Sequence, residues 1–140
     1  GYPEVDKPAQ GYDIKRGAQV YQQQCAICHG DSGQGQKVAK DYVMPPLWGK
    51  DSYNWGAGMH RINTAASFIK HNMPLGKPGS LSDQQAWDVA AWINRHERPQ
   101  DPRLVEGSIE KTRVKFHAND GVNLYGQEVD GVLIGQGTGS

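Results

Sequence analysis

The chain has 140 residues, a length typical of one domain with at most a modest extension. Its 15 Lys and Arg residues balance its 15 Asp and Glu residues, so nothing indicates a nucleic-acid partner or a charged tail. Hydrophobic residues make up 36% of the chain, which is little for a self-sufficient core, and 18 glycines with 8 prolines predict many loops. No apolar run is long enough to cross a bilayer, so we expect no membrane span.

Residues 1–12 are rich in proline and glycine and predict an extended N-terminal arm. Asp13 is suited to cap a helix over residues 14–24, because the apolar residues that follow it share one helical face. Gly17 lies within this helix, where glycine costs about 1 kcal/mol relative to alanine. We therefore expect another helix to approach closely at Gly17.

The run Cys25-Ala26-Ile27-Cys28-His29 comes directly after this helix and is typical of a covalent haem attachment site. In such a site the thiols of Cys25 and Cys28 become thioethers to the porphyrin, and His29 supplies a nitrogen ligand to the iron. A buried porphyrin would also provide the apolar bulk that the composition lacks. The alternatives are a redox C-x-x-C pair, half of a zinc site, or chance.

Two of these alternatives conflict with the rest of the sequence. A zinc site needs about four ligands, and the chain holds no cysteine beyond these two. A redox C-x-x-C usually lies near a βαβ pattern, and none follows. The motif therefore predicts one covalently bound haem c. Because bacteria attach such a haem outside the cytoplasm, we expect a periplasmic protein from which a signal peptide has been removed.

Residues 30–58 are rich in glycine and proline and predict loops with little regular structure. Pro45 and Pro46 would form a rigid turn within them. A ligating histidine normally donates its second ring N–H to a fixed acceptor, and a carbonyl oxygen of Pro45 or Pro46 is suited to accept from His29. The alternative is a plain loop anchor.

Two further helices are expected. One covers residues 64–71 and ends before Pro74, because the residue before proline avoids helical geometry. The other covers residues 83–96 and begins with a capping box at Ser82 and Gln85. Its wide apolar surface combines small residues with tryptophans, which suits a crossing against the first helix.

Residues 103–140 differ in character and predict a C-terminal extension of the domain formed by residues 13–102. An Asp-Gly pair between short β-prone runs predicts a hairpin over about 126–135, which should pack against the main body. We expect the tail 135–140 to be disordered.

The sixth ligand of the iron decides what the haem does, because two protein ligands are typical of electron carriers and an open position of gas binding or catalysis. Met73 is the preferred ligand, since it extends an apolar helical stripe and Pro74 stiffens its loop; His71 is the main rival, and core filling is the plain alternative for Met73. His96 and His117 are expected on the surface. The further candidates considered are Met44, Met59 and His60.

Together these features resemble the class I c-type cytochromes over roughly residues 10–98. The resemblance implies a mainly α, class I cytochrome c fold around one haem. It further implies that Cys25 and Cys28 form the thioether links and that His29 and Met73 are the axial ligands.

Residues 56–59, 68–76 and 82–91 also look like the second haem domain of dihaem thiosulfate dehydrogenases, which is understood as an electron exit. The catalytic haem of those enzymes lies on another domain and has a cysteine sulfur as its distal ligand. This chain has one haem motif and no spare cysteine. The lack of a second haem motif and of a spare cysteine argues against thiosulfate oxidation by this chain, and it leaves a role as an electron relay intact. Monohaem periplasmic cytochromes linked to extracellular electron exchange are another possible relative.

The expected function is periplasmic one-electron transfer by a haem with His/Met ligation, without catalysis at the iron. Redox partner proteins would dock transiently at the haem edge. One alternative is a haem enzyme or gas sensor with a labile or open sixth position. Another is a haem subunit of a larger sulfur-compound oxidoreductase, with the C-terminal hairpin as its docking element. The sequence leaves the oligomeric state and the partners open.

Overall fold

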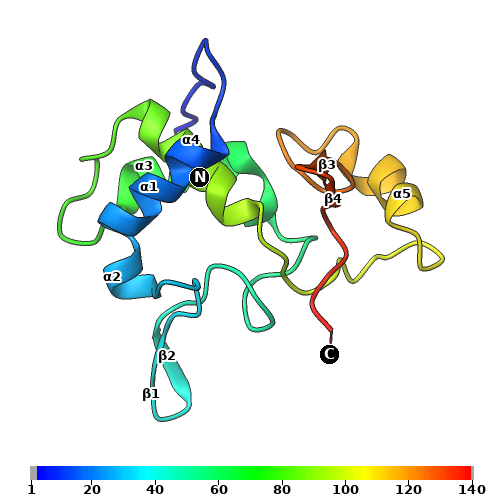
Figure 1. The fold of residues 1–140 in the computed structure, drawn as a ribbon, viewed down its shortest axis with the longest axis horizontal. Coiled ribbons are helices and arrows are strands. Elements are labelled where there is room, and N and C mark those ends of the chain that lie inside the picture. The colour runs from blue at the N-terminus through cyan, green and yellow to red at the C-terminus, as the bar shows by residue number, and fades with distance from the viewer. Residues whose placement is uncertain (1–2, 140) are drawn as a thin grey trace.

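A computed structural model describes residues 3–139 and shows a mainly helical molecule (Figure 1). The helices are α1 (Ile14–Gln24), α2 (Ala26–His29), α3 (Ile62–Asn72), α4 (Asp83–Asn94) and α5 (Ile109–Thr112), with the short 3-10 turn η1 (Gly58–His60) and the π-helical turn η2 (Arg113–His117). Two antiparallel hairpins pair β1 (Gln36–Val38) with β2 (Asp41–Met44) and β3 (Glu128–Val129) with β4 (Val132–Leu133). The mainly α prediction is confirmed, although α3 begins earlier and α4 ends earlier than expected.

The helices α1 and α4 cross at Gly17, as the sequence predicted. A Cβ atom at Gly17 would lie 1.9 Å from the backbone oxygen of Asp88 and 2.9 Å from the Cβ of Trp92. Only glycine allows this approach. The side chain of Asp13 caps α1 by accepting a hydrogen bond from the Arg16 amide at 2.9 Å.

A buried carboxylate ties the same two helices together. Asp88 on α4 is only 2% exposed. It accepts hydrogen bonds from the Asp13 amide at 2.8 Å and from the Arg16 Nε at 2.9 Å. The charge of Asp88 is therefore compensated from the start of α1, which fixes that end of the helix on α4.

The core lies where α1, α3 and α4 meet, and it includes side chains from the C-terminal extension. The predicted capping box of α4 is present, with Ser82 and Gln85 exchanging hydrogen bonds. The buried hydrophobic residues form one cluster that contains Tyr21, Trp55, Ile62, Trp87, Val89, Leu124, Tyr125 and Ile134, among others. Within residues 3–139, no helix is both long and apolar enough to cross a membrane.

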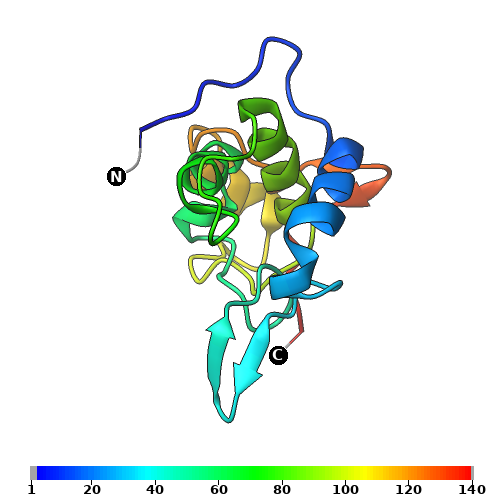
Figure 2. The ribbon, with the colours of Figure 1, turned by 90° about the vertical axis from the view of Figure 1, so that its left-hand side faces the viewer.

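The prediction of little regular structure over 30–58 was wrong for residues 36–44. They form the β1–β2 hairpin, which projects away from the helices (Figures 1 and 2). All three residues of β1 are exposed, and so are Tyr42 and Val43 on β2. Because the strands have no buried face, they show no alternation of apolar and polar residues, and no pattern in the sequence predicts them.

The C-terminal extension lies beside the helices in Figure 1 and ends in an ordered tail. The predicted hairpin is confirmed around Asp130-Gly131, between β3 and β4. The expectation of disorder over 135–140 was wrong for residues 135–139, while Ser140 lies outside the described residues. Backbone amides hold the tail: those of Gly135 and Gly137 donate to the Glu97 carboxylate at 3.0 and 2.8 Å.

Candidate functional site

The C-x-x-C-H run forms a short helical turn that continues from α1. Cys25 ends α1, donating its amide to the Tyr21 carbonyl at 2.9 Å, and its own carbonyl accepts from the His29 amide at 2.9 Å. The backbone bonds across Cys25 keep the two cysteines, three residues apart, within this one turn. His29 is buried at the end of the turn. The local fold thus presents two thiols and one imidazole together.

The ring of His29 is oriented by the proline turn. Its Nδ1 lies 2.9 Å from the carbonyl oxygen of Pro45. Because a carbonyl oxygen can only accept, Nδ1 carries the proton and Nε2 keeps its lone pair. Pro45 is exposed and Pro46 is buried, so the turn is anchored on one side. The imidazole is therefore in the tautomer that can bind a metal ion through Nε2.

The two thiols differ from a redox pair. Both cysteines are free and half-buried. Burial, with a smaller effect of Cys28, raises the pKa of the Cys25 thiol to about 11. A redox C-x-x-C motif works through a lowered thiol pKa, and a zinc site through thiolates. A protonated, half-buried thiol agrees better with a residue that becomes a thioether.

Met73 lies at the C-terminal end of α3, where its amide donates to the Ile69 carbonyl at 3.0 Å. Its side chain is half-buried and packs against the hydrophobic core cluster. Cys25, Leu47 and Trp48 border the same cluster. The rival ligand His71 is exposed at the end of the helix. Met44 ends β2, and Met59 lies in η1.

These residues fit a covalently attached haem. The imidazole Nε2 of His29 has a free lone pair, both thiols are available, and a half-buried thioether is present at Met73. This donor set matches what a c-type haem requires, namely two cysteine sulfurs and one or two axial ligands.

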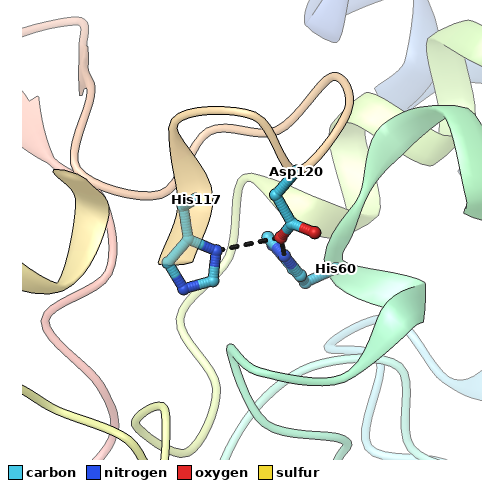
Figure 3. A group of neighbouring side chains, drawn as sticks. All are labelled: His60, His117 and Asp120. Carbon is cyan, nitrogen blue, oxygen red and sulfur yellow. Dashed lines mark hydrogen bonds and ion pairs between the residues drawn. The ribbon is translucent and has the colours of Figure 1, made fainter. Parts of the chain in front are cut away.

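Two histidines considered in the sequence instead form a polar cluster elsewhere. His117 was expected on the surface but is 3% exposed, and His60 is 1% exposed. His60 Nε2 lies 2.7 Å from Asp120 Oδ2, and His117 Nδ1 lies 3.0 Å from the same oxygen (Figure 3). Burial, partly opposed by Asp120, lowers the pKa of His60 to about 4. Because these residues come from distant segments, no sequence spacing could reveal the cluster.

His96 was also expected on the surface and is half-buried. Its ring stacks on Trp48 at 3.9 Å between centroids, and its Nδ1 contacts the Trp92 carbonyl oxygen at 2.8 Å. It therefore serves the packing between α4 and the loop after Pro46.

Comparison with protein families matches residues 12–93 to the model described as cytochrome c oxidase, cbb3-type, subunit III. Two curated thiosulfate dehydrogenases are also similar. The one from Stutzerimonas stutzeri (strain A1501) is 74% identical over 136 residues, which is 97% of this chain and 44% of that protein. The one from Thiomonas intermedia (strain K12) is 50% identical over 135 residues, or 96% and 42%. This chain thus spans less than half the length of these relatives.

Among solved structures, a thiosulfate dehydrogenase from Marichromatium purpuratum superposes with a TM-score of 0.91 at 56% sequence identity. The superposition covers 98% of this chain and 29% of that chain. The helices, both hairpins and the extension of this chain therefore superpose on less than a third of the length of that structure.

Proposed function

We propose a function for this chain, which belongs to the family of cbb3-type cytochrome c oxidase subunit III. It transfers single electrons through one haem c attached to Cys25 and Cys28. The observation that carries the proposal is the hydrogen bond from His29 Nδ1 to the Pro45 carbonyl oxygen at 2.9 Å. It leaves Nε2 as a fixed axial donor. We propose Met73 as the second axial ligand, as its place at the end of α3 suggests.

A bound haem supplies an iron that cycles between the ferric and ferrous states. The chain contributes a fixed imidazole at His29, a thioether at Met73 and an apolar surrounding. A thioether ligand and exclusion of water favour the reduced state and raise the reduction potential. With both axial positions filled by protein, no substrate binds at the iron, so we propose a carrier and not an enzyme.

Within this proposal, residues 13–102 form the haem domain, 1–12 an arm and 103–140 an extension. The family match ends at residue 93, which supports a boundary between the haem domain and the C-terminal extension. The relatives suggest that the chain works beside a thiosulfate-oxidising centre, as the electron exit of a larger oxidoreductase. We place it in the bacterial periplasm, where transient redox partners would dock at the haem edge.

The axial ligation is tested by spectroscopy of the ferric haem protein. We expect a low-spin spectrum with the weak sulfur-to-iron charge-transfer band, and loss of that band in Met73→Ala. Met44→Ala, Met59→Ala and His71→Gln serve as matched controls that keep the band. A band that survives in Met73→Ala would refute the ligand assignment.

A second measurement separates the carrier from an enzyme or gas sensor. A haem with two protein ligands binds carbon monoxide slowly in the ferrous form, because one ligand must first leave. Rapid binding by the unaltered protein would show an open sixth position and overturn the carrier proposal. Rapid binding confined to Met73→Ala would support it.

A further inference from the structure

Three side chains that do not belong to the proposed haem site converge from two separate parts of the chain. His60 ends η1, beside the start of α3, whereas His117 ends η2 and Asp120 follows it in the C-terminal extension. One nitrogen or oxygen atom from each of the three lies within 4.8 Å of the others. Figure 3 shows the two rings and the carboxylate facing one another. We call these residues the two-histidine cluster.

Both ring nitrogens of His117 face carboxylate oxygens, and a neutral imidazole can donate a hydrogen bond to only one of them. Its Nε2 lies 2.7 Å from Asp101 Oδ2, and its Nδ1 lies 3.0 Å from Asp120 Oδ2. A neutral imidazole has one N–H and one lone pair, so only one of these contacts can be a hydrogen bond. The other sets a lone pair against a carboxylate oxygen. Either a second proton or a metal ion must lie at that contact.

The two carboxylates that face His117 each have one arginine near them, at unequal distances. Asp101 is paired with Arg103, whose Nη2 lies 2.9 Å from Asp101 Oδ2. Asp120 is approached by Arg61, with 3.7 Å between Nη1 and Oδ1. That distance is long for a strong ion pair. The nearest partners of the Asp120 carboxylate are therefore the two buried imidazoles, and its arginine is farther away. Such a set attracts a divalent cation.

We propose that His60, His117 and Asp120 bind a zinc-class divalent metal ion, separate from the haem. Two histidines and one carboxylate are a known zinc ligand set, with the fourth position taken by water. Asp101 would hold the Nε2–H of His117 and so direct Nδ1 to the metal, as in carboxylate–histidine–metal arrangements. His117 then needs only one proton, which resolves the conflict between its two carboxylate neighbours.

To receive the ion, the three donor atoms, which now lie within 4.8 Å of one another, must move to tetrahedral spacing. Donor atoms around a tetrahedral zinc ion are about 3.3 Å apart, given metal–ligand bonds of about 2.0 Å. The present contacts of 2.7 and 3.0 Å would open by a few tenths of an ångström. A cavity of about 190 Å³, lined by His117, Gly121 and Asn123 among others, adjoins the cluster and offers a way in. The bound ion would fasten the extension to the helical core.

The test is a zinc titration of the complete haem-loaded chain after treatment with a chelator, followed by calorimetry. We expect one equivalent of zinc to bind, and at least tenfold weaker binding in His60→Gln, Asp120→Asn and Asp101→Asn. Each of these variants keeps a polar side chain of similar shape. His71→Gln removes an exposed histidine and is the matched control, which should bind like the unaltered protein. Circular dichroism and the haem spectrum check that each variant is folded.

X-ray absorption at the zinc edge then identifies the ligands without interference from iron. The proposal expects nitrogen and oxygen neighbours at about 2.0–2.1 Å, including two imidazoles. A second readout is the melting temperature, which zinc should raise in the unaltered protein and in His71→Gln but not in His60→Gln. Absence of stoichiometric binding, or binding that survives His60→Gln and disappears in His71→Gln, would overturn the proposal. In that case a proton, and not a metal ion, lies between His117 Nδ1 and Asp120 Oδ2.

Discussion

His29 and Pro45 are joined by a hydrogen bond of 2.9 Å between the ring Nδ1 and the proline carbonyl oxygen. The loop that carries this carbonyl is itself held at Leu47. The Leu47 amide donates to the Gly33 carbonyl at 2.8 Å, and its carbonyl accepts from Arg98 Nη1 at 2.9 Å. A residue far from the haem motif thus supports the orientation of the proposed axial histidine.

Replacing Arg98 by methionine should destabilise the protein strongly. The guanidinium is fully buried and donates to the carbonyls of Leu47 and Ile93, both at 2.9 Å. Methionine fills the stem but leaves the Leu47 carbonyl without this donor, at a cost of about 1–3 kcal/mol. The Ile93 carbonyl loses its 2.9 Å bond and keeps the longer contact of 3.4 Å from the His96 amide, so we expect a total loss of roughly 2–4 kcal/mol. Urea unfolding measures it. The control Arg95→Met, on a less buried neighbour, should change stability by less than about 0.5 kcal/mol, and equal losses in both variants would contradict the assignment.

Replacing Gly17 by alanine should force α1 and α4 apart. The added methyl group would meet the Asp88 backbone oxygen at 1.9 Å, which no rotation of a side chain can relieve. Overpacking of this kind costs about 1–3 kcal/mol, and we expect a value near the upper end. Gly139→Ala, where nothing lies within 4 Å, is the matched control. A Gly17→Ala protein with an unchanged melting temperature would show that the helices separate freely.

Local signals in the sequence predict the parts of the fold that local chemistry determines. Asp13 and the Ser82–Gln85 capping box mark the starts of α1 and α4 because side chains there satisfy free amides of the first turn. Gly17 indicated the helix crossing because a glycine inside a helix has a cost that close packing offsets. The C-x-x-C-H run predicts its own chemistry, since all its members lie within one turn.

The parts that the sequence could not predict depend on contacts between distant residues. His117 is far from Asp101 and His60 in the chain, and no periodicity indicates that the three are buried together. The strands β1 and β2 bury no face, so they lack the alternation that indicates a strand. The tail after Gly135 has few side chains that could pack, and its order comes from backbone amides that find the Glu97 carboxylate.

Replacing Glu97 by alanine should release this tail. The Glu97 Oε1 accepts from Trp55 Nε1 at 3.0 Å as well as from the Gly137 amide. The variant leaves the buried Trp55 N–H without a partner, at a cost of about 1–3 kcal/mol, and frees the amides of Gly135 and Gly137. Hydrogen exchange should become faster at both glycines. Glu128→Ala, at an exposed position in β3, should leave exchange there unchanged; slow exchange in Glu97→Ala would mean that other contacts hold the tail.

The buried ring of His60 should make stability depend on pH in mildly acidic solution. Burial lowers its pKa from 6.5 to about 4, with Asp120 acting in the opposite direction and His117 and Arg61 lowering it slightly. Between these two values the unfolded chain binds a proton at His60 that the native protein does not. Stability from this group is therefore complete above pH 6.5 and declines as the pH falls towards 4.

The size of this decline follows from the shift of the pKa. A unit of pKa corresponds to 1.36 kcal/mol, so the full effect is roughly 3 kcal/mol. Urea midpoints at several pH values, with a chelator present, measure it, and His60→Gln should lose this part of the slope. Burial raises the pKa of Asp101, but the hydrogen bonds from Arg103 and His117 outweigh burial and lower this pKa to about 2. Asp101 therefore makes stability depend on pH only in more acidic solution. Identical pH profiles for the two proteins between pH 6.5 and 4 would show that His60 gains its proton as readily in the native state as in the unfolded chain.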